Sequence, residues 1–129
     1  MLIDSHTHIF PQDYKQNHES ILKTDKTYAE LFQNESPPAD AEALVKSMAE
    51  HNIYKSIILG MGWTDRTLAS DINDYLIHSA EAYPDQLIPF CSVNPNWGEH
   101  SLYELERCFN QGVKGIGEIH PDTQNLDIT

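Results

Sequence analysis

The chain has 129 residues, 40% of them hydrophobic, which fits an ordinary globular domain and gives no sign of a fibrous or disordered protein. Its formal net charge is -12 at pH 7 with eight Lys and Arg residues, so binding to nucleic-acid phosphates is not expected. The same acidic charge favours a small-molecule substrate. No apolar run could span a bilayer and the N-terminus lacks the pattern of a signal peptide, so we expect a cytoplasmic protein.

The first apolar run, Leu2-Ile3, predicts a short strand at the N-terminus. The connection that follows, residues 9–39, is polar and much longer than a usual strand-to-helix loop. It contains aromatic residues and prolines, and two interpretations stand side by side. It could form a lid or wall over a functional site, or it could be an ordinary insertion with a short helix at about residues 28–32.

From about residue 40 onward, apolar runs alternate with segments of helical periodicity, which is the pattern of successive βα units. Asp40 can cap a helix over 41–49, and helices are also predicted over 68–83, before Pro84, and over 102–109, before Gly112. Strands are predicted at 56–59, 87–93 and 113–119. Cys91 and Cys108 show no metal or disulfide spacing and are interpreted as structural thiols. The sequence therefore predicts an α/β fold with four parallel strands and intervening helices.

A pair of histidines follows the first predicted strand, in the order Asp4-Ser5-His6-Thr7-His8. Side chains alternate between the two faces of an extended chain, so the rings of His6 and His8 should share one face. Two neutral imidazoles placed in this way can bind one divalent cation. Histidines at this spacing also occur on solvated strands, and the metal site is favoured because parallel barrels build their sites at this edge of the sheet.

The last predicted strand ends with Glu118 and His120, which alternation again places on one face. Glu118 lies between apolar residues, where a charge is costly unless a cation meets it, so it is a candidate metal ligand. His120 could contact the substrate or support the cation, or it could be a polar residue at the end of a strand. Residues that follow strand ends, namely Trp63, Asn94 and Trp97, are further candidates for substrate binding.

Three segments resemble the amidohydrolase-related (Amidohydrolase 2) family of metal-dependent TIM-barrel enzymes: IDSHTHIFP from Ile3, LIPFCSVNP from Leu87 and GVKGIGEIHPDTQ from Gly112. The resemblance implies that His6 and His8 bind a divalent metal, usually zinc, and that Glu118 occupies the ligand position after the fourth strand. The Gly-Glu pattern is also similar to TatD-type deoxyribonucleases, in which the glutamate is a ligand. The continuation His120-Pro121-Asp122 favours the amidohydrolase branch.

The resemblance implies the first half of a (β/α)8 barrel, residues 1–129, because the family takes further histidines and an aspartate from strands beyond the fourth. Four strands leave two sheet edges open, so we expect self-association or a second half-barrel, and little turnover by this chain alone. The expected activity is hydrolysis of a small carboxylate, amide or lactone by a metal-activated water. Alternatives are a decarboxylase of the same family, a TatD-like nuclease, or a non-catalytic fragment or split-barrel module.

Overall fold

The computed structural model describes residues 1–129 and contains one four-stranded sheet with the order β1-β2-β3-β4. The strands are β1 (Ile3–Thr7), β2 (Lys55–Ile58), β3 (Leu87–Cys91) and β4 (Gly115–Ile116), and each neighbouring pair is parallel. Consecutive strands pair with each other, as in a barrel that is wound in one direction. The predicted α/β fold with four parallel strands is confirmed.

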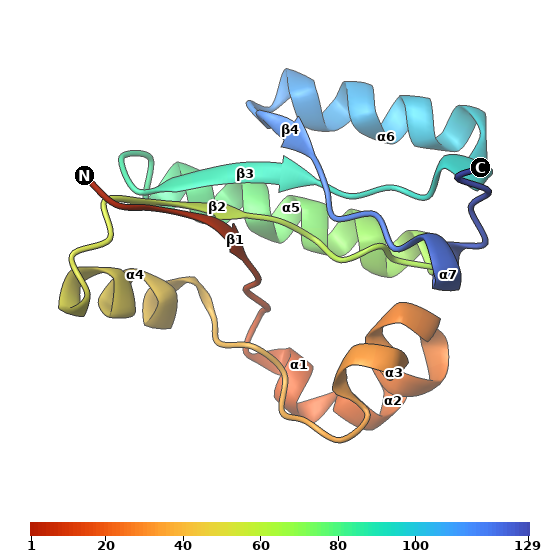
Figure 1. Ribbon diagram of the computed structural model, residues 1–129, viewed down its shortest axis with the longest axis horizontal. Helices are drawn as coiled ribbons and strands as arrows, with labels where there is room; N and C mark the ends of the chain where they lie inside the picture. The colour runs from red at the N-terminus through yellow and green to blue at the C-terminus, as the bar shows by residue number, and fades with distance from the viewer.

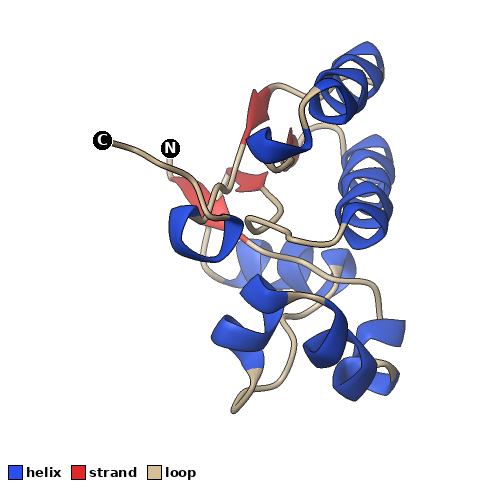
Figure 2. Cartoon of the chain, turned by 90° about the vertical axis from the view of Figure 1, so that its right-hand side faces the viewer, coloured by secondary structure: helices blue, strands red, loops and turns tan.

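The three long helices connect the strands: α4 (Ala41–Glu50), α5 (Arg66–Ala82) and α6 (Glu99–Asn110). Asp40 caps α4 by accepting a hydrogen bond from the backbone N–H of Ala43 at 2.9 Å, and Asp65 caps α5 in the same way through Leu68. Figure 2 shows the helices arranged around one side of the strands. All three predicted helices are confirmed, with α6 beginning a few residues earlier than predicted.

The main hydrophobic core lies between the sheet and helices α4 and α5, and it contains Ile58, Met48, Ile72 and Leu76. A smaller cluster under α6 contains Ile77, Cys91, Cys108 and Val113. Both cysteines are buried and free, as expected for structural thiols. No helix is both long and apolar enough to cross a membrane.

The connection between β1 and α4 folds into three short helices, α1 (Asp13–Gln16), α2 (His18–Thr24) and α3 (Lys26–Phe32), and a short helix therefore does cover residues 28–32. The expectation of a polar connection needs correction, because Phe10, Tyr14 and Tyr28 are buried in the main core. Phe10 also lies 5.9 Å from Trp63, measured between ring centroids. In Figure 1 this group of helices lies on the side of the molecule toward which the strands point.

The last strand is shorter than predicted. Residues 113–119 were expected to be extended, but β4 covers only Gly115–Ile116. The ladder ends because the N–H of Glu118 donates to the carbonyl of Gly60, beyond β2, and no longer to a residue of β3. The predicted third strand also ends two residues early, at Cys91. Two short helical segments follow these strand ends, η1 (Pro95–Trp97) and α7 (Pro121–Gln124).

Candidate metal centre

The rings of His6 and His8 lie side by side at the carboxyl end of β1. Their Nε2 atoms are 3.1 Å apart and their ring centroids are 4.9 Å apart, with the ring planes nearly perpendicular. The N–H of His6 donates to the Asp4 carboxylate at 3.2 Å, and the pairing of β1 with β2 becomes irregular between Asp4 and Thr7. The strand thus presents both rings toward one point.

Glu118 reaches the same point from the segment that follows β4. Its Oε2 lies 2.9 Å from Nε2 of His6 and 3.4 Å from Nε2 of His8. The three side chains are partly exposed at an open rim, and none of the four surface cavities of the molecule includes them. Residues at the ends of the first and last strands of the sheet, His6, His8 and Glu118, therefore form one cluster of possible metal ligands.

The spacing of these three atoms fits a shared cation. Nitrogen and oxygen ligands lie about 2.0 to 2.2 Å from zinc, so two ligands of the same ion are separated by about 3.0 to 3.5 Å. The observed separations of 2.9, 3.1 and 3.4 Å fall close to this range. Two imidazoles and one carboxylate are also a donor set that suits first-row divalent metals.

The tautomer of His8 supports the same interpretation. Its Nδ1 lies 3.0 Å from the carbonyl oxygen of Leu59, and a carbonyl can only accept a hydrogen bond, so Nδ1 carries the proton. Nε2 of the neutral ring is then left with a lone pair that faces the Glu118 carboxylate. Nε2 of His6 can carry a proton and donate it to Glu118. Nε2 of His8 and Oε2 of Glu118 then still face each other as two acceptors at 3.4 Å. A cation between the three side chains would bind the lone pairs of His6, His8 and Glu118 together.

His120, a candidate substrate contact, lies two residues after Glu118 but outside this cluster. Its Nδ1 is 3.0 Å from the hydroxyl of Thr123, which in turn contacts the hydroxyl of Thr27 in α3. Each hydroxyl has one proton to donate. The Thr27 hydroxyl donates its proton to the carbonyl of Gly62 at 2.5 Å, so it must accept from Thr123. The Thr123 proton is then used, so Thr123 accepts a hydrogen bond from His120. The hydrogen bonds therefore place the His120 proton on Nδ1 and leave Nε2 as an acceptor.

The other predicted substrate contacts, Trp63, Asn94 and Trp97, are buried or contact other residues of the chain. Trp63 is fully buried in the aromatic part of the core and has no exposed surface, while its Nε1 has no hydrogen-bond partner. Asn94 is also buried, and its side chain accepts from the N–H of Asn96 at the start of η1. Trp97 packs edge to face with His100. Their substrate-binding roles stay predictions that this arrangement does not favour.

Two groups that support the site were not predicted from the sequence. One is the carbonyl of Leu59, which orients His8, and the other is the hydroxyl of Ser92, which donates to the carbonyl of Glu118 at 2.8 Å. A backbone carbonyl has no signature in the sequence. Ser92 lies within the predicted strand 87–93, between the apolar residues Cys91 and Val93, so the pattern that singled out Glu118, a polar residue between apolar neighbours, applies to it as well.

Fold and site together describe part of a (β/α) barrel with a candidate metal centre at the carboxyl ends of its strands. Neither protein-family models nor curated protein sequences match the chain. Among solved structures, it is similar to one described as amidohydrolase II, with 20% identity, a TM-score of 0.70 and coverage of 90% of this chain and 39% of the other.

A second similar structure is 5-carboxyvanillate decarboxylase from Novosphingobium aromaticivorans, complexed with manganese and 4-hydroxy-3-methoxy-5-nitrobenzoic acid. It is 24% identical over 98% of this chain and 43% of the other, with a TM-score of 0.69. A third is 4-oxalomesaconate hydratase from Rhodopseudomonas palustris, 20% identical over 90% of this chain and 40% of the other, with a TM-score of 0.57. The chain thus has the fold of one part of these proteins and spans about two fifths of their length.

Proposed function

We propose that this chain carries the metal-binding part of an amidohydrolase-type enzyme, with His6, His8 and Glu118 as ligands of one divalent cation. The observation that carries the proposal is the convergence of their three donor atoms at 2.9 to 3.4 Å. A bound cation supplies Lewis-acid chemistry, because it polarises a carbonyl or carboxylate oxygen and lowers the pKa of a water molecule. His6, His8 and Glu118 would hold the ion at the exposed carboxyl end of the sheet.

The metal is proposed to be zinc or manganese. Zinc agrees with the histidine-rich donor set. Manganese is supported by the decarboxylase structure, which contains that ion and shares the fold over 98% of this chain. A carboxylate in the donor set suits either ion.

The proposed reaction is hydrolysis of a small carboxylate, amide or lactone. Nonoxidative decarboxylation is the second candidate, and the similarity to 5-carboxyvanillate decarboxylase favours it. In either reaction we propose that His120 accepts a hydrogen bond from the substrate, since its Nε2 is the free acceptor of the ring. The acidic composition, with 20 Asp and Glu residues, supports a small molecule rather than a nucleic acid as substrate.

The open edges of the sheet support a further part of the proposal. β1 pairs only with β2, and β4 pairs only with β3. Apolar side chains near these edges are exposed, including Ile3 at 45% and Ile116 at 45%. We propose that a second copy of the chain, or a second half-barrel from another polypeptide, covers these edges and completes the coordination of the metal.

Metal titration tests the proposed site. Chelator-treated protein is titrated with Mn²⁺ while the electron paramagnetic resonance signal of the free ion is recorded, and with Zn²⁺ in competition with a chromophoric chelator. We expect one equivalent to bind, and His6→Ala, His8→Ala and Glu118→Gln each to weaken binding at least about tenfold. The matched control is His51→Ala, because His51 lies at the end of α4 and hydrogen-bonds to Ser47. Absence of binding, or an equal loss in the control, would contradict the proposal.

Ligand probes separate the two candidate reactions. The metal-loaded protein is mixed with 4-hydroxy-3-methoxy-5-nitrobenzoic acid, the compound in the decarboxylase structure. A parallel sample receives citric acid, which is bound in a structure from Acinetobacter baumannii described as a probable 2-pyrone-4,6-dicarboxylic acid hydrolase. The visible spectrum of a Co²⁺-substituted site reports which compound reaches the metal. A change with the aromatic acid but not with citrate favours decarboxylation, and the absence of any change with the aromatic acid counts against it.

A further inference from the structure

Glu118 lies beyond the last residue of β4, so the regular hydrogen bonds of the sheet do not hold it. Two other contacts fix its backbone. Its N–H donates to the carbonyl of Gly60 at 2.9 Å, and its own carbonyl accepts from the hydroxyl of Ser92 at 2.8 Å. The Ser92 hydroxyl lies farther, 3.4 Å, from the carbonyl of Met61, so Glu118 is its better acceptor. The peptide groups on both sides of the Glu118 side chain are therefore anchored.

Ser92 is itself fully buried and is clamped by one side chain of α5. Its N–H donates to Oδ1 of Asn73 at 2.9 Å, and its carbonyl accepts from Nδ2 of Asn73 at 3.0 Å. The side-chain amide of Asn73 thus pairs with both the N–H and the carbonyl of Ser92. Because donor and acceptor must each face a fixed partner, the orientation of this amide is defined by its contacts.

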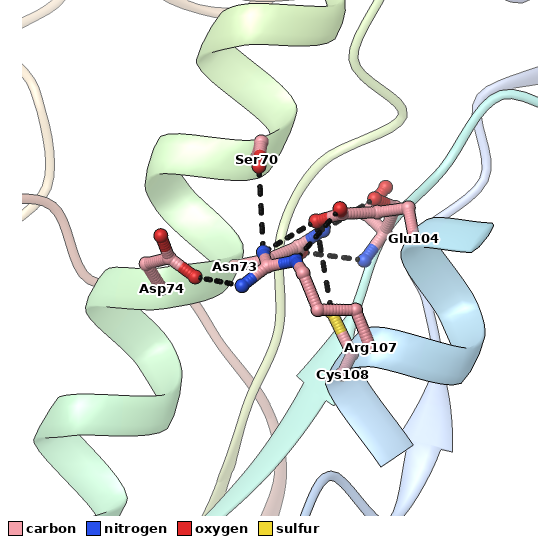
Figure 3. Close-up of polar contacts among 7 residues, drawn as sticks. Ser70, Asn73, Asp74, Glu104, Arg107 and Cys108 are labelled. Atoms are coloured by element: carbon pink, nitrogen blue, oxygen red, sulfur yellow. Dashed lines mark hydrogen bonds and ion pairs between the residues drawn. The ribbon is translucent and has the colours of Figure 1, made fainter. Parts of the chain in front are cut away.

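A charged group on α6 strengthens this orientation. Nδ2 of Asn73 also donates to Oε1 of Glu104 at 3.1 Å, and Glu104 accepts two hydrogen bonds from Arg107, at 2.7 and 3.0 Å. Arg107 extends to Asp74 on α5, with 2.5 Å between Nη1 and Oδ1. Figure 3 shows this network, in which the guanidinium of Arg107 lies between side chains of the two helices. A continuous set of hydrogen bonds joins the α5–α6 interface to the backbone of Glu118.

We propose that Ser92 is a positioning residue for Glu118 and that Asn73, Glu104 and Arg107 hold Ser92 in place for this role. The inference rests on the proposed function of Glu118 as a metal ligand. Groups that hydrogen-bond to metal ligands commonly change metal affinity about 10- to 100-fold when they are removed. In Ser92→Ala the carbonyl of Glu118 loses its hydrogen-bond donor. The peptide group after Glu118 can then rotate more freely, so the Glu118 carboxylate spends less time next to His6 and His8.

A purely structural role for Ser92 predicts a different result, so the test compares two buried serines. Ser79 donates its hydroxyl to the carbonyl of Tyr75 within α5 at 2.7 Å, and it has no contact with the network. Ser79→Ala therefore loses a similar hydrogen bond at a site that does not involve Glu118. Both variants are prepared in the full chain, and circular dichroism confirms that each is folded.

The readout is Mn²⁺ affinity, measured from the paramagnetic resonance of the free ion. We expect Ser92→Ala to bind Mn²⁺ about tenfold more weakly than the unmodified chain and Ser79→Ala to bind it equally well. Ser92→Cys keeps a weaker donor and should fall between Ser92→Ala and the unmodified chain, which also provides a second variant if the alanine variant does not fold. Unchanged affinity in folded Ser92→Ala or Ser92→Cys overturns the positioning role. Absence of Mn²⁺ binding by the unmodified chain would instead remove the proposed metal site itself.

Discussion

Nδ1 of His8 lies 3.0 Å from the carbonyl oxygen of Leu59, the residue that directly follows β2. The next carbonyl along the chain, that of Gly60, accepts the N–H of Glu118 at 2.9 Å. His8, which follows the first strand, and Glu118, which follows the fourth, therefore both hydrogen-bond to carbonyls at the end of the second strand. Contacts within the chain thus hold the ring of His8 and the backbone of Glu118 at the same strand end.

Metal binding should stabilise the fold, because an ion held by His6, His8 and Glu118 links the two end strands. At a free metal concentration of about 100 times Kd, the free energy of unfolding rises by about 2.7 kcal/mol. For a domain of this size the melting temperature should rise by about 10 °C. Calorimetry with and without Zn²⁺ measures the shift, and His8→Ala should abolish it. A rise of the same size in that variant would locate the metal elsewhere.

A second prediction concerns the tautomer of His120. In the neutral ring the proton should reside on Nδ1, because the chain of hydroxyls from Thr123 through Thr27 ends at the carbonyl of Gly62. Thr27→Val removes the hydroxyl that accepts from Thr123, so Thr123 becomes free to donate to His120 and the proton should move to Nε2. Thr27→Ser keeps the hydroxyl and should retain the original tautomer.

Nitrogen-15 spectra of the histidine rings, recorded through their carbon-bound protons, distinguish the two tautomers directly. His51 provides an internal reference, because its Nδ1 donates to the carbonyl of Ser47 and is remote from Thr27 in the sequence. Its tautomer should be the same in all three proteins. Identical His120 signals in Thr27→Val and Thr27→Ser would show that the hydroxyl chain does not control this ring.

The histidine cluster was predictable because two simple rules act on it. Alternation along an extended chain places the rings of His6 and His8 together, and parallel strands bring their carboxyl ends to one edge, where Glu118 follows. The extent of β4 was not predictable in this way. The sequence from Val113 to Ile119 has the composition of a strand, and only the three-dimensional contact of Glu118 with Gly60 ends the ladder.

The connection between β1 and α4 was the least predictable part of the fold. Its helices have 4, 7 and 7 residues, too few turns for an apolar stripe to repeat. Their burial depends on Phe10 and Tyr28, which pack with Trp63 from the segment after β2. The position of Trp63 after a strand end suggested a substrate contact, but the sequence could not show that these aromatic residues cover its ring.

A third prediction follows from the network at the α5–α6 interface. Burial alone would raise the pKa of Glu104, but hydrogen bonds from Arg107 and Asn73 and the charge of Arg107 outweigh it and lower the pKa below its ordinary value of 4.5. A carboxylate with a lowered pKa stabilises the fold at pH values above 4.5, and this contribution is lost as the pH falls through the pKa of the folded state.

Glu104→Gln should therefore be less stable than the unmodified chain near pH 7 by about 1 to 3 kcal/mol, and the difference should shrink below pH 4.5. Urea unfolding at a series of pH values measures both quantities. The control is Glu106→Gln on the same helix, since Glu106 is exposed and outside the network. A difference that stays constant down to pH 3 would show that the charge of Glu104 does not contribute.

The last prediction concerns Asp25, a buried residue that attaches the three short helices to the rest of the barrel. Its Oδ1 accepts from the N–H of Tyr28 at the start of α3. Its Oδ2 accepts from the backbone N–H groups of Thr64 and Asp65, at 2.7 and 2.9 Å, and from the Thr64 hydroxyl. One carboxylate thus joins the connection after β1 to the loop that precedes α5.

Asp25→Asn replaces Oδ2 or Oδ1 by an amide nitrogen, which cannot accept, and leaves at least one buried N–H without a partner. We expect a loss of about 2 to 4 kcal/mol in the free energy of unfolding. Hydrogen exchange should also become faster over α1–α3 than over α5, because the anchor of the short helices is weakened while the core under α5 is intact. Asp13→Asn, at an exposed position of α1, is the matched control. Equal exchange rates over α1–α3 in Asp25→Asn and Asp13→Asn would show that the aromatic packing of Phe10 and Tyr28 holds these helices without Asp25.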